Sequence, residues 1–109
     1  MSDKEYLDRL VKYGEKILAY MNAVKEFQEF SSNSEKVDAV ILNLEQIGET
    51  AKKLSEETIA NYPKLNWQSI IGLRNMISHE YEGIRLEIIY DIAKNKIHYL
   101  CKYIEGIIK

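Results

Sequence analysis

The chain has 109 residues, 46% of them hydrophobic, a length that allows one compact core but is short for two ordinary domains. We therefore expect a single domain over residues 1–109. Fifteen lysines and arginines against 17 aspartates and glutamates leave a formal charge of −2, so no overall basic field would hold a nucleic acid, and any RNA contact must be local. One cysteine excludes an internal disulfide, and no apolar run or signal-like segment predicts membrane insertion, so we expect a cytoplasmic protein.

The first helix is expected over roughly residues 3–28. Its apolar residues fall in one narrow sector, as in an amphipathic bundle helix: Leu7, Leu10, Val11, Ile17, Leu18, Met21 and Val24. Tyr6, Tyr13 and Tyr20 repeat every seven residues along one flank of this sector. They could stack on bases, but a bundle edge or a subunit contact is the commoner role of such a row.

A second helix is expected after the serine cluster, because Ser32 and Glu35 have capping-box spacing. Its apolar stripe consists of Val37, Val40, Ile41, Leu44, Ile47, Ala51 and Leu54. Gly48 lies inside the stripe, where a missing side chain lets a neighbouring backbone approach. Glu45 and Glu49 lie outside it as an i, i+4 pair, and we interpret them mainly as part of a solvated face.

The next helical segments are placed by local signals. Ser55 could start a short extra turn, which must stop before Pro63 because proline restricts the preceding residue. Asn66 is the expected N-cap of a third helix that begins at Trp67 and runs to about Glu80.

A fourth helix is expected from about Arg85 to the C-terminus, after a break at Gly83. Its apolar residues span about 220°, far more than the roughly 100° that one packed face requires, which indicates a central helix or a subunit interface. His98 falls on its polar side and is expected at the surface, and Cys101 falls at the apolar margin and is expected to pack. Four helices joined by short turns, with no alternating strand pattern, predict an all-α antiparallel four-helix bundle.

The polar arc of the third helix contains the chemically informative residues. Asn75 and His79 form one i, i+4 row, Arg74 and Ser78 form the adjacent row, and Tyr81 returns nearly above Arg74 if the turn persists. No histidine has a glutamate three residues earlier, and no His-x-x-x-His pair or second cysteine completes a zinc site, so we expect no metal and no other cofactor.

Arginine and histidine can together transfer a phosphodiester of RNA without a metal, because RNA supplies its own 2′-hydroxyl nucleophile. A histidine side chain, which ordinarily has a pKa of about 6.5, could exchange the proton of the 2′-hydroxyl or of the 5′-leaving oxygen. Arg74 could neutralise the charge on the non-bridging oxygens, leaving a 2′,3′-cyclic phosphate. Spacing alone favours a structural role for His79 near a helix C-terminus over a catalytic one.

Residues 74–81 have the pattern R-N-x-x-x-H-x-Y, and here the chain resembles the HEPN superfamily, specifically the HepT-like toxins of prokaryotic toxin–antitoxin pairs. Residues 43–54 also look like the second helix of that family, and residues 62–70 look like its approach to the motif. The resemblance therefore covers essentially the whole chain. Thr50 and Arg85 depart from the commonest family residues, but neither lies in the proposed chemistry.

The resemblance implies a helical homodimer in which two Arg/His motifs share one cleft and act as a metal-independent endoribonuclease, the toxin of a type VII-like system. Arg74 and His79 would be catalytic, with Asn75 and Ser78 as supporting polar residues. Tyr81 matches the tyrosine to which an MntA-like nucleotidyltransferase antitoxin adds AMP, and such bulky negative groups would repel an RNA phosphate. The alternative is a non-catalytic helical adaptor that binds a nucleotidyltransferase or a nucleotide; the intact Arg/His pair favours the enzyme.

Overall fold

The structure is a computed structural model that describes residues 2–79 and 85–108, without the side chains of Ser78 and His79. These two ranges are mostly helical, and neither range contains a strand. In chain order the elements are α1 (Asp3–Met21), α2 (Phe27–Ser31), α3 (Ser34–Ala51), α4 (Glu56–Asn61), α5 (Trp67–Ile71), α6 (Leu73–His79), α7 (Leu86–Asp91), the π-helical turn η1 (Ile92–Lys96) and α8 (Ile97–Ile108).

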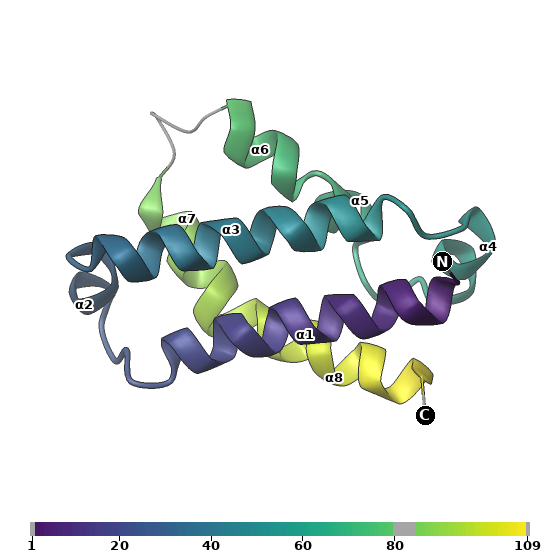
Figure 1. Cartoon of the computed structure of the whole chain (residues 1–109), viewed down its shortest axis with the longest axis horizontal. Coiled ribbons are helices and arrows are strands. Elements are labelled where there is room, and N and C mark those ends of the chain that lie inside the picture. The colour runs from purple at the N-terminus through teal and green to yellow at the C-terminus, as the bar shows by residue number, and fades with distance from the viewer. Residues whose placement is uncertain (1, 80–84, 109) are drawn as a thin grey trace.

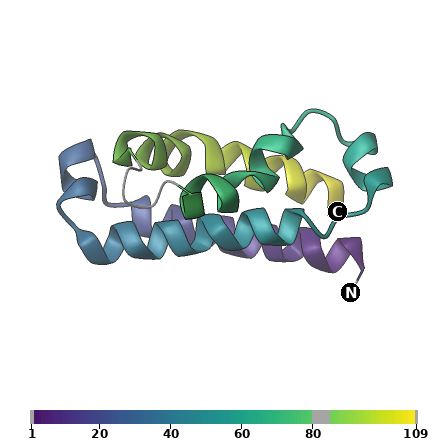
Figure 2. The ribbon, with the colours of Figure 1, turned by 90° about the horizontal axis from the view of Figure 1, so that it is seen from above.

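The long elements form an antiparallel four-helix bundle. The helices α1 and α3 lie side by side in opposite directions, α5 and α6 return along α3, and α7, η1 and α8 run back along α1 (Figures 1 and 2). The short helices α2 and α4 lie at opposite ends of the bundle, and the two termini lie at the same end (Figure 1). The predicted all-α bundle is confirmed.

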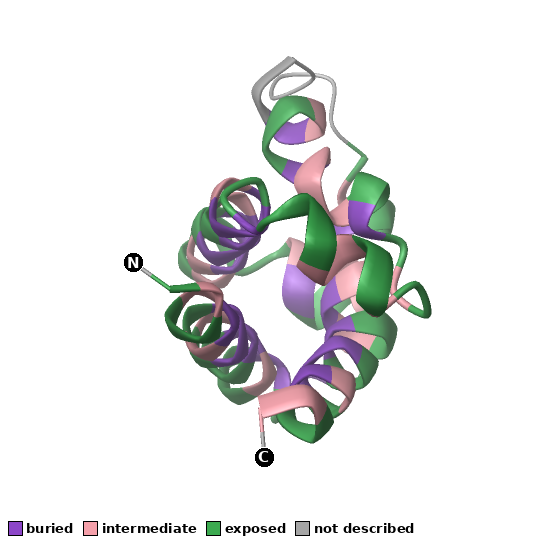
Figure 3. Ribbon diagram, turned by 90° about the vertical axis from the view of Figure 1, so that its right-hand side faces the viewer, coloured by how far each residue is buried: buried purple, intermediate pink, exposed green. Residues whose placement is uncertain are grey.

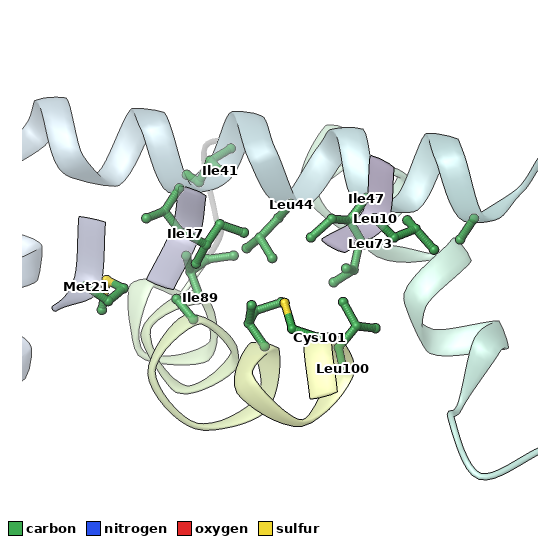
Figure 4. Packing of buried hydrophobic residues seen from close by; sticks show 14 of the residues in the cluster. Leu10, Ile17, Met21, Ile41, Leu44, Ile47, Leu73, Ile89, Leu100 and Cys101 are labelled. Carbon is green, nitrogen blue, oxygen red and sulfur yellow. The ribbon is translucent and has the colours of Figure 1, made fainter. Parts of the chain in front are cut away.

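Aliphatic side chains from all four parts of the bundle pack together in its centre (Figure 4). In the end view, the buried parts of the helices lie toward the middle of the bundle (Figure 3). The largest fully buried side chains are Phe30, Leu10, Ile17, Leu44, Ile47, Ile77, Ile89, Ile104 and Val40. Most of them are the apolar positions that recur at helical spacing in the sequence, so the burial of one stripe per helix accounts for the fold.

The first helix ends at Met21, whereas the prediction placed its end near residue 28. The amide of Val24 donates to the carbonyl of Met21 at 3.0 Å, which turns the chain out of the helix. The ammonium of Lys94 in η1 donates to the carbonyl of Val24 and, at 3.5 Å, to that of Met21. A cation at a helix C-terminus satisfies carbonyls that have no partner within the helix. The chain then forms α2, which buries Phe30.

Asn33 caps α3, so the predicted Ser32 capping box is wrong. The Oδ1 of Asn33 accepts a hydrogen bond from the amide of Lys36 at 3.0 Å. Ser32 instead ends α2, and its hydroxyl donates to the carbonyl of Gln28 at 2.7 Å, so this side chain bonds back into α2.

Two predicted helix starts are confirmed. The hydroxyl of Ser55 accepts from the amide of Thr58 at 3.2 Å and caps α4, the short extra helix before Pro63. The side chain of Asn66 accepts from the amide of Ser69 at 3.1 Å and caps α5.

The third helix is not continuous, because it is divided at Gly72 into α5 and α6. The backbone at this glycine stays in the right-handed helical region, with φ −74° and ψ −9°. The predicted end near Glu80 and the predicted break at Gly83 lie outside the described residues.

The fourth helix contains the π-helical turn η1, which explains its wide apolar sector. Such a turn accommodates one extra residue, which rotates every later side chain back by about 100°. Ile89 before the turn and Ile97 and Cys101 after it are thereby all buried, while Ile88 is 41% exposed. The sector is therefore two narrow stripes that differ in phase, and its width no longer argues for a subunit interface.

Three further expectations concern single side chains. His98 is exposed and Cys101 is buried, as predicted. Tyr6 and Tyr13 pack partly buried against the core and Tyr20 is 37% exposed, which places the tyrosine row at a bundle edge. No helix in the described ranges is long and apolar enough to cross a membrane.

Candidate active site

Helix α6 presents Arg74 and Asn75 outward. Leu73 and Ile77 on the same helix are buried against the bundle, whereas Arg74 and Asn75 are exposed. Asn66 caps the start of the α5–α6 segment. The spacing of the apolar residues in this segment determines which face is buried, so Arg74 and Asn75 must point to solvent. The separation of polar and apolar residues on this helix is therefore as predicted for these four positions.

Arg74 forms an ion pair with Glu49 of α3. Its Nε lies 3.2 Å from Oε1 of Glu49, and the two side chains are 50% and 43% exposed. Glu49 is thus not simply part of a solvated face, and this residue of the site was missed by the sequence interpretation. Its position beside Gly48, where a close helix approach is expected, was the signal that could have found it.

The close backbone approach predicted at Gly48 is confirmed, and the structure identifies the partner as the α5–α6 segment. A Cβ built on Gly48 would lie only 3.0 Å from the backbone nitrogen of Arg74 and 3.2 Å from the carbonyl oxygen of Ile70. The two backbones therefore meet where a glycine lacks a side chain. This approach places Glu49, the next residue along α3, within reach of Arg74.

The ion pair orients the guanidinium more than it stabilises the fold. A pair this exposed contributes at most about 1 kcal/mol to folding, because water screens both charges. A guanidinium has five N–H donors in a planar fork, more than one carboxylate can accept. Arg74 therefore keeps donors for a second anion, and a phosphate is a group that this fork fits.

The other predicted site residues are described only in part. The backbone of Ser78 and His79 forms the last turn of α6, and their side chains lie outside the description. Tyr81 lies wholly outside the described residues. The roles of His79, Ser78 and Tyr81 therefore stay predictions. Within the described ranges, no group of three or more histidine, cysteine, aspartate or glutamate side chains could hold a metal ion.

An apolar hollow of about 300 Å³ lies on a different side of the α5–α6 segment from Glu49. Leu73 and Ile47 line it, and on α3 Ile47 and Glu49 point in nearly opposite directions because they are two residues apart. Its polar lining groups are Asn66, Ser69, Lys96 and Tyr99. Neither Arg74 nor Glu49 lines this hollow, so we do not identify it with the active site.

Comparison with known proteins places the chain in a family. The model of the Ribonuclease HepT-like family matches residues 5–107. The chain is 45% identical to the candidate RNase MJ0127 of Methanocaldococcus jannaschii over 83 residues, which cover 76% of this chain and 69% of that protein. It is 30% identical to a second candidate RNase of that organism, MJ1216, over 97% of this chain and 87% of that protein.

A further relative is the probable ribonuclease HepT of Thermococcus cleftensis, which is 26% identical over 88% of this chain and 86% of that protein. No solved structure matches the chain significantly. The family match extends over nearly all of the sequence, including the motif at residues 74–81 and the α3 segment that contacts it. The chain therefore belongs to the HepT-like ribonuclease family of the HEPN superfamily.

Proposed function

We propose that this chain is a metal-independent endoribonuclease in which Arg74 and His79 cleave RNA. The observation that carries the proposal is the outward-facing Arg74, which Glu49 holds through one ion pair while most of its donors stay available. In a chain with a net charge of −2, an oriented arginine is the local phosphate contact that RNA cleavage requires. Membership of a ribonuclease family supports the same activity.

In the proposed reaction the 2′-oxygen of a ribose attacks the adjacent phosphorus and the 5′-oxygen leaves. The 2′-hydroxyl loses a proton and the leaving oxygen gains one, and His79 exchanges one of these two protons. Arg74 stabilises the negative charge that builds on the non-bridging oxygens. The products are a 2′,3′-cyclic phosphate and a 5′-hydroxyl. The reaction requires no metal and no external nucleophile.

Helix geometry supports a site that is shared by two copies of the chain. His79 follows Arg74 by five residues, which separates the two positions by about 140° around α6 and about 7.5 Å along its axis. One copy therefore offers the two groups on flanking sides of the helix rather than on one face. A homodimer that brings two α6 helices together would supply arginine and histidine to both sides of one phosphate.

We further propose that the protein is a cytoplasmic toxin and that an MntA-like nucleotidyltransferase antitoxin inactivates it by adding AMP to Tyr81. Tyr81 follows His79 by two residues, so an added phosphate would carry negative charge close to the catalytic pair. Such a charge repels the RNA backbone and its bulk obstructs the cleft. Asn75 and Ser78 complete the polar surface of the motif.

Cleavage of RNA in the presence of EDTA tests the ribonuclease. We expect the wild-type protein to produce cyclic phosphate ends in chelator, and Arg74→Ala and His79→Ala to lose this activity. The matched controls are Arg9→Ala and His98→Ala, which remove an exposed arginine and an exposed histidine from other helices. Both controls should cleave like the wild type.

Two results would contradict the proposal. Equal cleavage by the wild type and by both motif variants would trace the activity to a contaminating nuclease. Cleavage that disappears in EDTA and returns with a divalent cation would refute the metal-independent mechanism.

Mass spectrometry after co-expression with a nucleotidyltransferase encoded beside the gene tests the regulation. The protein should gain mass in multiples of one AMP, and Tyr81→Phe should gain none. Modification of Tyr81→Phe to the same extent as the wild type would refute the assignment to Tyr81.

A further inference from the structure

We propose that Gly48 is a positioning residue, which sets the place of Arg74 beside α3 and so determines how fast the site turns over. The inference rests on the proposed ribonuclease function of Arg74. It adds a residue that contributes no polar side chain and acts only by being small.

The space at Gly48 is closed by three backbone atoms of the α5–α6 segment. A Cβ at this position would lie 3.0 Å from the nitrogen of Arg74, 3.2 Å from the carbonyl oxygen of Ile70 and 3.4 Å from that of Ile71. The first two distances are shorter than ordinary van der Waals contact. Because backbone atoms cannot rotate away as a side chain can, one methyl group must push the α5–α6 segment away from α3.

The displaced segment includes the start of α6, the helix that carries Arg74. The residue that follows Gly48 in α3 is Glu49, which forms the ion pair with Arg74. Gly48 touches the backbone of Arg74, while Glu49 holds its guanidinium at 3.2 Å. Two consecutive residues of α3 thus fix both ends of one catalytic side chain. A shift of a few tenths of an ångström at the backbone changes the angle from which the guanidinium meets a phosphate.

Two other helix glycines are matched controls for this effect. A Cβ on Gly14 of α1 would meet the Sγ of Cys101, so alanine there strains the core without pushing on α6. A Cβ on Gly106 of α8 would meet nothing within 4 Å. The three alanine substitutions therefore add the same methyl group in three surroundings: beside the site at Gly48, in the core at Gly14 and in open space at Gly106.

Steady-state cleavage of RNA by these variants is the first test. We expect Gly48→Ala to lower kcat about tenfold and to change KM less than about twofold, because it misplaces a group that acts in the transition state. Gly106→Ala and Gly14→Ala should keep the wild-type kcat at a temperature where circular dichroism shows all three folded. A kcat of Gly48→Ala within about twofold of the wild type would overturn the proposal.

The NMR signal of the Arg74 Nε–H group gives a readout that does not depend on activity. The signal is assigned by its absence in Arg74→Ala and by its shift in Glu49→Ala, which removes the partner carboxylate. Gly48→Ala should move it toward its position in Glu49→Ala, and Gly106→Ala should leave it unmoved. An unmoved signal in Gly48→Ala would overturn the positioning role, whereas a wild-type protein that shows the expected shifts but cleaves no RNA would refute only the ribonuclease.

Discussion

Alanine at Gly14 is predicted to destabilise the bundle, even though alanine favours helix. A Cβ at this position would overlap Sγ of Cys101 and lie 3.4 Å from Cγ2 of Ile97. The contact with the sulfur is far inside van der Waals distance. The sulfur has little room to retreat, because it is buried and lies 3.9 Å from the carbonyl oxygen of Val11. Figure 4 shows Cys101 among the aliphatic side chains of the core.

The magnitude follows from two opposing effects. Inserting a methyl group into a packed core costs about 1 to 3 kcal/mol, while replacing glycine by alanine within a helix gains about 1 kcal/mol. Gly14→Ala should therefore lose up to about 2 kcal/mol of unfolding free energy. In a Cys101→Ala background the clash is gone, and the same substitution should become stabilising by about 0.5 to 1 kcal/mol.

Urea unfolding of the wild type, both single variants and the double variant measures this change of sign. All four proteins must be compared at one concentration, because any self-association would add to the apparent stability. Equal m-values would show that the unfolded states are comparable. The reasoning is refuted if Gly14→Ala stabilises the protein with Cys101 in place, or if the two substitutions add within about 0.5 kcal/mol.

The remaining predictions concern the ion pair between Arg74 and Glu49, the side-chain carboxylate of Asp3 and the thiol of Cys101. Glu49→Ala should reduce the rate of cleavage about tenfold, because the ion pair orients Arg74. It should change the unfolding free energy by less than about 1 kcal/mol, because both side chains are about half exposed. A greater loss of unfolding free energy in urea, together with a smaller loss of cleavage, would contradict this reasoning. The side chains of Ser55 and Thr58 donate hydrogen bonds to Asp3 and lower its pKa below the usual 3.8. A carboxyl group whose pKa is lower in the folded than in the unfolded state stabilises the fold above the unfolded pKa, and this stabilisation is lost as the pH falls. Asp3→Asn should therefore be less stable than the wild type at neutral pH, and the difference in unfolding free energy should shrink below about pH 4. Persistence of the full difference at pH 3 would exclude this linkage. Burial, with the charges of two nearby glutamates, raises the pKa of Cys101 to about 11, so iodoacetamide should label it slowly at neutral pH and rapidly in concentrated urea.

Local signals predicted much of the fold. The caps at Ser55 and Asn66 were predictable because each side chain bonds an amide only three residues further along the chain. The buried stripes were predictable because one helix period relates their residues, as the full burial of Leu44 and Ile47 illustrates. The outward position of Arg74 follows from the same period.

Contacts between distant residues explain where prediction from the sequence failed. The end of α1 at Met21 depends on Lys94, more than 70 residues away, and no local pattern near Met21 announces that cation. The phase change of the fourth helix depends on a π-helical turn, and a wheel with a constant angle per residue cannot represent it. The apparent width of its apolar sector was the result.

The sequence by itself determined the apolar stripes of the first three predicted helices, the capped starts of α4 and α5, and the motif that resembles the family. Those features depend on residues that are neighbours along the chain or within one helix period. Only the tertiary structure decided that Glu49 belongs with Arg74 and that Gly48 brings their helices together. These pairings depend on how closely two helices approach, and the packing of the whole bundle sets that distance.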